Sequence, residues 1–485
     1  MQSSITILDN STGNVVAIVG QFGEKTGNLL NNYANDAQRQ PGSSIKPLSV
    51  YSPGLEMGLI SPITVVDDYP YNDSNRTGWP VNSGAARYKG LTTIRSGLTN
   101  SVNTIAVRVL AGMITPQVSF NFVQDKFKID LEEAVQKNGK IMSDIDVAPL
   151  AMGGLTKGVC TRDMAEAYET FPNNGVYTVS RTYTKVEDSS GKVILDNQSV
   201  KEPVIKDTTA YYINSMLTDV VNKGTAAGHG LSGMTSAGKT GTTSENYDRW
   251  FVGYTPYYTA AVWTGYPMNE KMRTQGNPAL NLWQQVMNQV HKGLENKKFP
   301  VPNGLVNVKF CLDSGLQATE YCAMDPRGSR VSSDGVFQSH VPSGFCTIHT
   351  AESVVTVCKD SPILDSDGNP TGLYHIAGPY CPQESLMQMC LPDYDREQIG
   401  TATAEDNMYR KSVVESYGPC TVHTAPPVVV EPENPGTEHP GGPTDPNDPN
   451  GGSSSEPGGG GTTDPGGSGH NPGNEEPPAQ DILRW

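Results

Sequence analysis

The sequence predicts an α+β fold, in which helices cover a sheet whose strands come from both ends of one globular segment. Near the start, the strand-like residues 5–8 and 15–19 flank the turn-forming residues 10–14, which predicts a hairpin. Three more strand-like segments follow Gly238, at 239–243, 250–254 and 258–264. Helical segments fill the chain between the two sets of strands, so we expect a layered arrangement with helices packed on the sheet.

Apolar periodicity and capping residues place the helices. They are expected at 94–110, 118–126, 145–152, 162–171 and 208–221, with a last amphipathic helix at 280–294. A strand pair is expected at 183–187 and 193–196. Thr161 is the candidate cap of the helix at 162–171, and Cys160 is expected to be a small buried residue rather than a reactive thiol.

Composition divides the chain into three parts. Its 485 residues are enough for two to four domains, but the 51 Gly and 36 Pro are unevenly spread. The first part has a globular composition, whereas the last is rich in Pro, Gly, Ser, Thr and Asp, which predicts disorder. The predicted boundaries are 1–297, 298–420 and 421–485. A net charge of −16 argues against nucleic acid or an anionic membrane surface as the main partner.

Most cysteines lie in the middle part, which has little regular pattern: Cys311, Cys322, Cys346, Cys358, Cys381, Cys390 and Cys420. The residues around Cys311 resemble those around Cys358, and a further cysteine follows each, so we expect two small related units. Such clustering in a loop-rich region favours disulfides and an oxidising compartment. The alternative is zinc, because Cys346 and His349 offer two ligands, but no second Cys-x-x-Cys pair supports it.

The sequence shows neither a membrane span nor an export signal. No apolar run is long enough to cross a bilayer, and no basic segment precedes an apolar one at the N-terminus. An oxidising compartment requires export. We therefore expect the natural N-terminus, with its anchor, to be missing from this chain.

Reactive chemistry is expected at residues 40–47, Gln-Pro-Gly-Ser-Ser-Ile-Lys-Pro. Ser43 suits the first turn of a helix, and Lys46 lies three positions on, so the two side chains share a face. A serine is a weak nucleophile until a base takes its proton, and Lys46 can do so if burial and the helix dipole hold it neutral. Taken alone, the same residues are also typical of an ordinary helix cap followed by a solvated lysine.

Two further motifs follow in the chain. Ser101-x-Asn103 places a hydroxyl and an amide on one side of a turn, and Lys239-Thr240-Gly241-Thr242 reads as a strand. In that strand Lys239 and Gly241 face one way, and the two threonines face the other. Gly241 leaves room for a ligand backbone. In isolation, the first motif could be a helix cap and the second an edge strand.

Together, the three motifs match the signature of penicillin-recognising serine enzymes. The longer segments 39–47, 153–159, 239–243 and 250–256 resemble the transpeptidase domain of class A penicillin-binding proteins. The resemblance covers about residues 3–295, and the segment 311–349 resembles an extension that follows this domain in some Gram-positive members. It implies a five-stranded antiparallel sheet covered by helices, small Cys-rich β units and a disordered tail.

The resemblance also implies a D,D-transpeptidase that crosslinks peptidoglycan stem peptides through a serine acyl-enzyme and is inhibited by β-lactams. Ser43 would attack the donor peptide, Lys46 would accept its proton, and Ser101 would pass that proton to the departing D-alanine. Substrate contacts would come from Asn103, Lys239, Thr240, Gly241 and Thr242, and the backbone N–H groups of Ser43 and Thr242 would form an oxyanion hole. No cofactor or metal is implied.

The implied setting is the extracellular face of a bacterial cell membrane or the cell wall, in a Gram-positive organism. The implied partners are stem peptides, β-lactams and, through the missing N-terminal region, the cell-wall synthesis machinery. Class A members also carry a glycosyltransferase domain and a membrane helix, which this sequence does not show, so only the crosslinking half is assigned.

Two alternatives to a transpeptidase stay open. A serine β-lactamase or D,D-carboxypeptidase uses the same motifs but hands the acyl group to water. A non-catalytic wall-binding scaffold would keep the fold and work through its Cys-rich units. The Cys-rich extension and the class A context argue against the first, and the complete motif set argues against the second.

Overall fold

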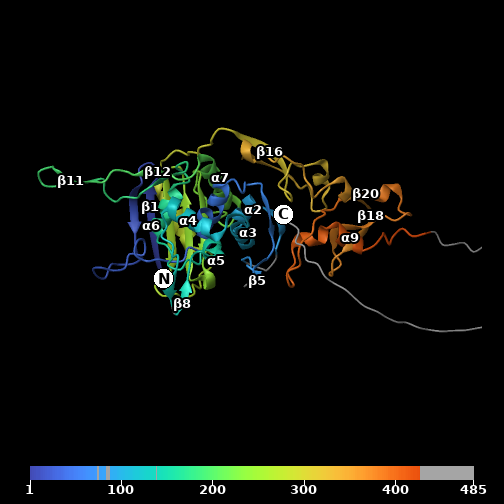
Figure 1. Cartoon of the computed structure of the whole chain (residues 1–485), viewed down its shortest axis with the longest axis horizontal. Coiled ribbons are helices and arrows are strands. Elements are labelled where there is room, and N and C mark those ends of the chain that lie inside the picture. Colours follow the sequence, from blue (N-terminus) through green and yellow to red (C-terminus); the bar gives the residue numbers. More distant parts are fainter. Residues whose placement is uncertain (74–75, 84–87, 138, 426–485) are drawn as a thin grey trace, which may run out of the picture. The chain divides into compact units, whose positions relative to one another are not determined.

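The two strand-rich ends of the globular segment meet in one sheet in the computed structural model. Strand β1 (Gln2–Asp9) pairs antiparallel with both β2 (Asn14–Val19) and β15 (Tyr258–Gly265). Strand β14 (Asp248–Tyr254) lies between β15 and β13 (Ala237–Thr242). The order is β13-β14-β15-β1-β2, so the predicted five-stranded antiparallel sheet and the α+β fold class are confirmed. Figure 1 labels β1 of this sheet and the helix α6 (Thr161–Glu169), which contacts it.

The structure describes residues 1–73, 76–83, 88–137 and 139–425. Residues 1–425 form one compact unit. The predicted boundary at residue 297 therefore stays a prediction, and nearly all of the tail predicted at 421–485 lies outside the described residues.

Helices cover both faces of the sheet. Neighbouring side chains of a strand point to opposite faces, so the contacts of a single strand show what lies on each face. On β14, Phe251 contacts Trp283 of α8 (Pro278–Val290), with ring centroids 4.9 Å apart. Tyr254 points the other way, where its ring lies 6.4 Å from that of Tyr168 on α6 (Thr161–Glu169). Its hydroxyl also donates to Asn214 of α7 (Asp207–Lys223). The sheet is thus the middle layer of the fold.

The other helices and several short hairpins lie between β2 and β13 in the chain. The helices are α1 (Ser52–Glu56), α2 (Ile94–Thr99), α3 (Asn103–Val109), α4 (Pro116–Phe127) and α5 (Val147–Met152). The paired strands are β3 (Val65–Asp68) with β6 (Gly90–Thr93), β4 (Tyr71–Asp73) with β5 (Arg76–Trp79), β7 (Val135–Lys137) with β8 (Lys140–Met142), β9 (Val176–Thr178) with β12 (Lys201–Pro203), and β10 (Lys185–Glu187) with β11 (Val193–Asp196).

Two local expectations need correction. The single helix expected at 94–110 is broken between α2 and α3, because Ser101 has a φ of +58° that an α-helix cannot hold. Thr161 is not the cap of α6. Cys160 takes that position, its N–H donates to the Asp163 carboxylate at 3.0 Å, and the Thr161 hydroxyl instead hydrogen-bonds to Thr6. Cys160 is buried, as expected, and burial raises the pKa of its thiol to about 12.

The Cys-rich extension contains two small β units. Strand β16 (Leu305–Cys311) pairs with β17 (Val331–Phe337), and β18 (Val354–Leu364) lies between β19 (Pro370–Ile376) and β20 (Leu386–Cys390), with α9 (Lys411–Ser416) packed on β19. All eight cysteines are free thiols, so the predicted disulfides are wrong. Six of the thiols converge in threes, each set around one histidine.

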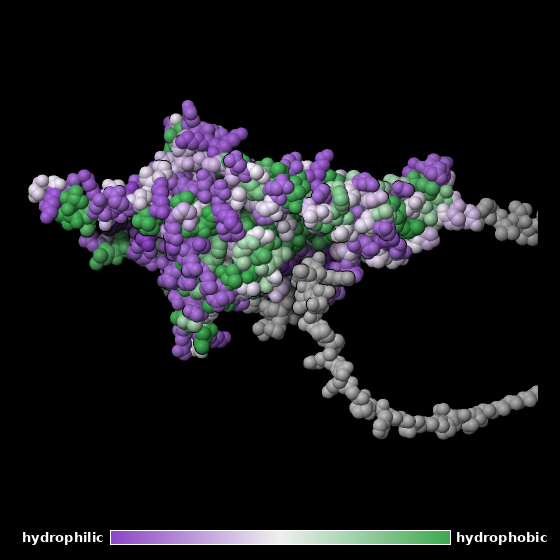
Figure 2. Space-filling view, turned by 45° about the horizontal axis from the view of Figure 1, so that its top comes forward, coloured by the Kyte–Doolittle hydropathy of each residue, from purple (hydrophilic) through white to green (hydrophobic). Residues whose placement is uncertain are grey.

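Among the described residues, no helix combines the length and the apolar character that a bilayer crossing needs. On the face shown in Figure 2, hydrophobic and hydrophilic residues are interspersed.

Candidate active site

Ser43 lies in a short 3-10 turn, η1 (Gly42–Ile45), that contacts strand β13. Two glycines make this contact possible. Gly42 has a φ of +54°, and a Cβ atom there would lie 2.4 Å from the carbonyl oxygen of Thr242. A Cβ atom on Gly241 would lie 2.2 Å from the carbonyl oxygen of Pro41. The first and third predicted motifs are therefore in direct backbone contact.

Lys46 is completely buried beneath this turn. Its Nζ donates to the carbonyl oxygen of Ser101 at 2.9 Å and to Oδ1 of Asn103 at 2.8 Å. No carboxylate pairs with it among the residues that the structure describes. Burial, and then the charge of Lys239, hold the pKa of Lys46 well below its usual value. A neutral amine, which is the form that can accept a proton, is thereby favoured.

Ser101 lies between the two buried lysines, on the left-handed turn that joins α2 to α3. Its carbonyl faces Lys46, and its hydroxyl accepts a hydrogen bond from Nζ of Lys239 at 2.7 Å. Burial lowers the pKa of Lys239 to about 7. The second motif therefore links the first and third through hydrogen bonds.

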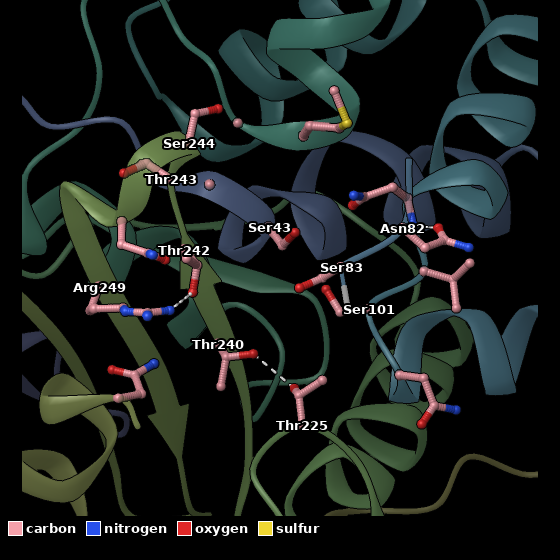
Figure 3. Close-up of a pocket in the computed structure, with 18 of the residues that line it drawn as sticks. Ser43, Asn82, Ser83, Ser101, Thr225, Thr240, Thr242, Thr243, Ser244 and Arg249 are labelled. Atoms are coloured by element: carbon pink, nitrogen blue, oxygen red, sulfur yellow. Dashed lines mark hydrogen bonds between the residues drawn. The ribbon is translucent and has the colours of Figure 1, made fainter. Parts of the chain in front are cut away.

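A cavity of about 1070 Å³ opens above these groups. Its lining includes Asn103. Figure 3 shows four other lining residues, Ser43, Ser101, Thr240 and Thr242. Within the strand, the two threonines face the cavity, whereas Lys239 and Gly241 are buried, which confirms the predicted alternation. Five of the eight predicted residues thus line one open cavity, and the other three, Lys46, Lys239 and Gly241, are buried next to them.

Two residues of this site were missed from the sequence. Arg249 lies directly across the sheet from Thr242, and its guanidinium donates to the Thr242 hydroxyl at 2.7 Å. The second strand expected from the sequence began at residue 250, so Arg249 was not paired with Thr242. Asn82 accepts a hydrogen bond from the Asn103 N–H at 3.0 Å and donates to Asp68 at 2.7 Å. No sequence pattern pointed to Asn82.

Comparisons with known proteins agree with the motifs. A family model described as "Penicillin binding protein transpeptidase domain" matches residues 3–289. Penicillin-binding protein 1A of Clostridium perfringens is 35% identical over 363 residues, which cover 72% of this chain and 42% of that protein. Its counterpart in Clostridium botulinum is 32% identical over 367 residues, which cover 73% of this chain and 43% of the relative. The chain spans less than half the length of these curated relatives.

Solved structures share the fold. Penicillin-binding protein 1A of Haemophilus influenzae matches with a TM-score of 0.58 and 21% identity over 71% of this chain and 54% of that chain. The PonA1 protein of Mycobacterium tuberculosis, solved in complex with penicillin V, matches with a TM-score of 0.51 and 25% identity over 62% of this chain and 81% of that chain.

Proposed function

Because the chain belongs to the penicillin-binding protein transpeptidase family, we propose that it crosslinks peptidoglycan stem peptides as a D,D-transpeptidase, through an acyl-enzyme on Ser43. One observation carries the proposal. Three segments far apart in the sequence place Ser43, a buried Lys46 and the Ser101–Lys239 hydrogen bond at one cavity.

In the proposed first step, Oγ of Ser43 attacks the carbonyl carbon between the two D-alanines of a donor peptide. The neutral amine of Lys46 takes the proton from Ser43, because burial favours its unprotonated form. The Ser101 hydroxyl, which accepts a hydrogen bond from Lys239, gives its proton to the departing amine and is reprotonated by the ammonium that Lys46 has become. The C–N bond breaks, an ester bond to Ser43 remains, and D-alanine leaves.

The terminal carboxylate of the donor fits the strand β13 side of the cavity. Thr240 and Thr242 present hydroxyls there, Lys239 lies below, and Arg249 supplies a fixed positive charge next to Thr242. On the opposite side, Asn103 is held between Lys46 and the carbonyl oxygen of Val81, so its amide is oriented for the peptide backbone.

Gly42 and Thr242 are in close backbone contact, so Ser43, which follows Gly42, lies near Thr242, and we assign the N–H groups of Ser43 and Thr242 to the oxyanion hole. Together they would stabilise the oxyanion of the tetrahedral intermediate, each donor contributing about 3 kcal/mol. In the second step, an amine from another stem peptide attacks the ester and forms the crosslink. A β-lactam mimics the D-Ala-D-Ala end and acylates Ser43 without ready release. Since this substrate lies outside the cell, the proposed location is the extracellular face of the bacterial membrane or the wall.

Labelling with a fluorescent penicillin tests the proposal. The wild-type protein should take a stable label, and Ser43→Ala should take none. Ser83→Ala is the matched control, because Ser83 is a second serine of the same cavity and should label normally. Absence of label on the wild type, or equal labelling of Ser43→Ala, contradicts the proposal. A label that is hydrolysed within minutes would instead support a β-lactamase.

A further inference from the structure

The Cys-rich extension contains two clusters of possible metal ligands, each made of three cysteines and one histidine. The first is Cys311, Cys322, Cys346 and His349, and the second is Cys358, Cys381, Cys420 and His423. In each cluster, the four ligand atoms all lie within 4.8 Å of one another. Six of the seven cysteines in the extension belong to these clusters, and only Cys390 does not.

The histidine has the same geometry in both clusters. In the first, Nδ1 of His349 lies 3.4 Å from Sγ of Cys311 and 3.6 Å from Sγ of Cys346. In the second, Nδ1 of His423 lies 3.4 Å from Sγ of Cys358 and 3.6 Å from Sγ of Cys420. A tetrahedral zinc ion with its usual bond lengths requires a sulfur–nitrogen separation of about 3.6 Å.

The other ring nitrogen of each histidine faces a carboxylate. Nε2 of His349 lies 3.0 Å from Oδ2 of Asp325, and Nε2 of His423 lies 3.8 Å from Oδ2 of Asp360. A proton on Nε2 leaves the lone pair of Nδ1 pointing at the sulfurs. Metal-bound histidines are usually oriented by such a carboxylate.

Backbone amides are directed at the sulfur atoms. The N–H groups of Asp313, Thr319 and His349 donate to the three sulfurs of the first cluster at 3.3–3.4 Å, and the N–H of Gly378 donates to Cys381 at 3.3 Å. Such hydrogen bonds stabilise the negative charge of a thiolate, which is the form that binds a metal.

We propose that each cluster binds one zinc ion through three thiolates and one imidazole, so that the chain holds two structural zinc ions. A disulfide would use only two sulfurs of a cluster and would leave the third thiol and the histidine without a partner. An iron–sulfur cluster, whose ligands bind separate irons, needs more space than ligand atoms within 4.8 Å allow. All four positions are taken by protein ligands, as in structural rather than catalytic zinc sites.

The sequence repeat supports two equivalent sites. Each site begins with the pattern Cys-x-Asp-Ser, at Cys311 and at Cys358, and ends with Cys-x-x-His, at Cys346 and at Cys420. The aspartate of the first pattern faces the histidine in both units, at 3.5 Å for Asp313 and 3.8 Å for Asp360. The two units therefore share ligands and outer contacts, although the spacing between their ligands differs.

The extension around the first site has too small an apolar core to account for its stability, so a bound metal ion would help to hold it together. Around the first site, the buried apolar side chains are few: Phe310 and Val336 form one small cluster with Ile63, and the ligand cysteines themselves form another. Small units with little apolar core usually depend on metals or disulfides. Because no disulfide is formed, the metal is the available source of stability.

The extension reaches the active-site cavity, so its order matters there. Arg327 is paired with Asp313 and Asp325 next to the first site, and its guanidinium lies 5.6 Å from the ring of Tyr409. Glu405, four residues before Tyr409, is one of the residues that line the active-site cavity. Its N–H donates a hydrogen bond to the carbonyl oxygen of Tyr88. A zinc ion at the first site would hold this rim in place.

Native mass spectrometry of the full chain, purified with zinc and a reductant, tests the proposal. The wild type should carry two zinc ions, whereas Cys346→Ser and Cys420→Ser should each carry one. Cys390→Ser is the matched control, because Cys390 is buried in the same extension but lies outside both clusters. It should retain two ions.

Cobalt(II) substitution of the wild type gives a second measurement that needs no variant. Two equivalents should produce the visible absorption of tetrahedral cobalt and sulfur-to-cobalt charge-transfer bands. Fewer than two bound ions, iron in place of zinc, or a mass that lacks hydrogens because disulfides have formed would each overturn the proposal. So would a Cys346→Ser or Cys420→Ser chain that still carries both ions.

Discussion

The region around the active-site cavity and the Cys-rich extension bury positive charge in opposite ways. Lys46 and Lys239 are completely buried, and neither has a carboxylate partner among the described residues. In the extension, Arg396 lies between Asp67 and Asp406, with nitrogen–oxygen distances of 2.7 Å to each. Arg327 lies between two carboxylates in the same way.

The difference separates reactivity from stability. A buried amine without a counter-charge destabilises the folded state, but its lowered pKa makes it a base near neutral pH. A buried arginine between carboxylates keeps its charge and holds segments together, and breaking such a group is costly. The buried lysines of the active site therefore lower the stability of the fold but supply reactive amines. The extension is instead stabilised by ion pairs and, in our proposal, by zinc.

Removing the proposed base should have the largest effect. Lys46→Met should slow acylation by penicillin about 10²- to 10⁴-fold, which is the usual contribution of a general base. It should leave the free energy of unfolding at neutral pH unchanged or higher, because a buried amine is lost. Stopped-flow acylation and urea unfolding measure the two effects. Lys89→Met, at an exposed lysine of the same cavity, should change the acylation rate little. A large loss of stability in Lys46→Met would contradict the account.

Removing a buried positive charge from the extension should instead lower stability. Arg396→Met should lower the free energy of unfolding by about 3–5 kcal/mol, because Asp67 and Asp406 are left facing each other. As a control, Lys185→Met breaks an exposed pair with Glu187 and should cost less than about 0.5 kcal/mol. Urea unfolding measures the loss of stability in both variants. Similar losses in Arg396→Met and Lys185→Met would show that burial of the ion pair does not matter.

The pH dependence of stability should show the buried amine of Lys239. Its pKa is about 7 in the folded protein, below the value of an exposed lysine, so the unfolded chain binds more protons between these two values. Stability should therefore rise as the pH rises above 7, by up to about 1.4 kcal/mol per pH unit. Lys239→Met should flatten this rise in thermal unfolding scans. An unchanged slope would mean that Lys239 does not titrate in this range.

The two zinc sites should differ slightly in their resistance to a chelator. All four ligands of the first site are buried, whereas Cys381 and His423 of the second are partly exposed. We expect the second site to lose its ion first, as followed by native mass spectrometry during incubation with a chelator. Simultaneous loss, or loss from the first site before the second, would contradict this order.

The sequence was most informative where chemistry restricts residue choice. Ser43, Lys46, Ser101, Asn103 and the strand at Lys239 were found from their motifs, and the period of two along the strand placed its threonines at the cavity. Asn82 could not be found, because it meets Asn103 only through folding of a loop.

The cysteines show the other limit. The repeat around Cys311 and Cys358 predicted two related units, but spacing does not tell which thiols converge in space. Ten residues separate Cys311 from Cys322, and their ligand partners come from another loop, so a Cys-x-x-Cys pair was the wrong signal to require. His423 lies at the edge of the Pro-rich tail, where composition alone suggested no structure.

The most direct test of the central claim is to find the atom that penicillin modifies. Mass spectrometry of the intact penicillin-treated protein, followed by peptide mapping, should show one adduct per chain on the peptide that contains Ser43. An adduct on any other residue, or an unmodified Ser43 in protein that has bound penicillin, would contradict the mechanism proposed for this cavity.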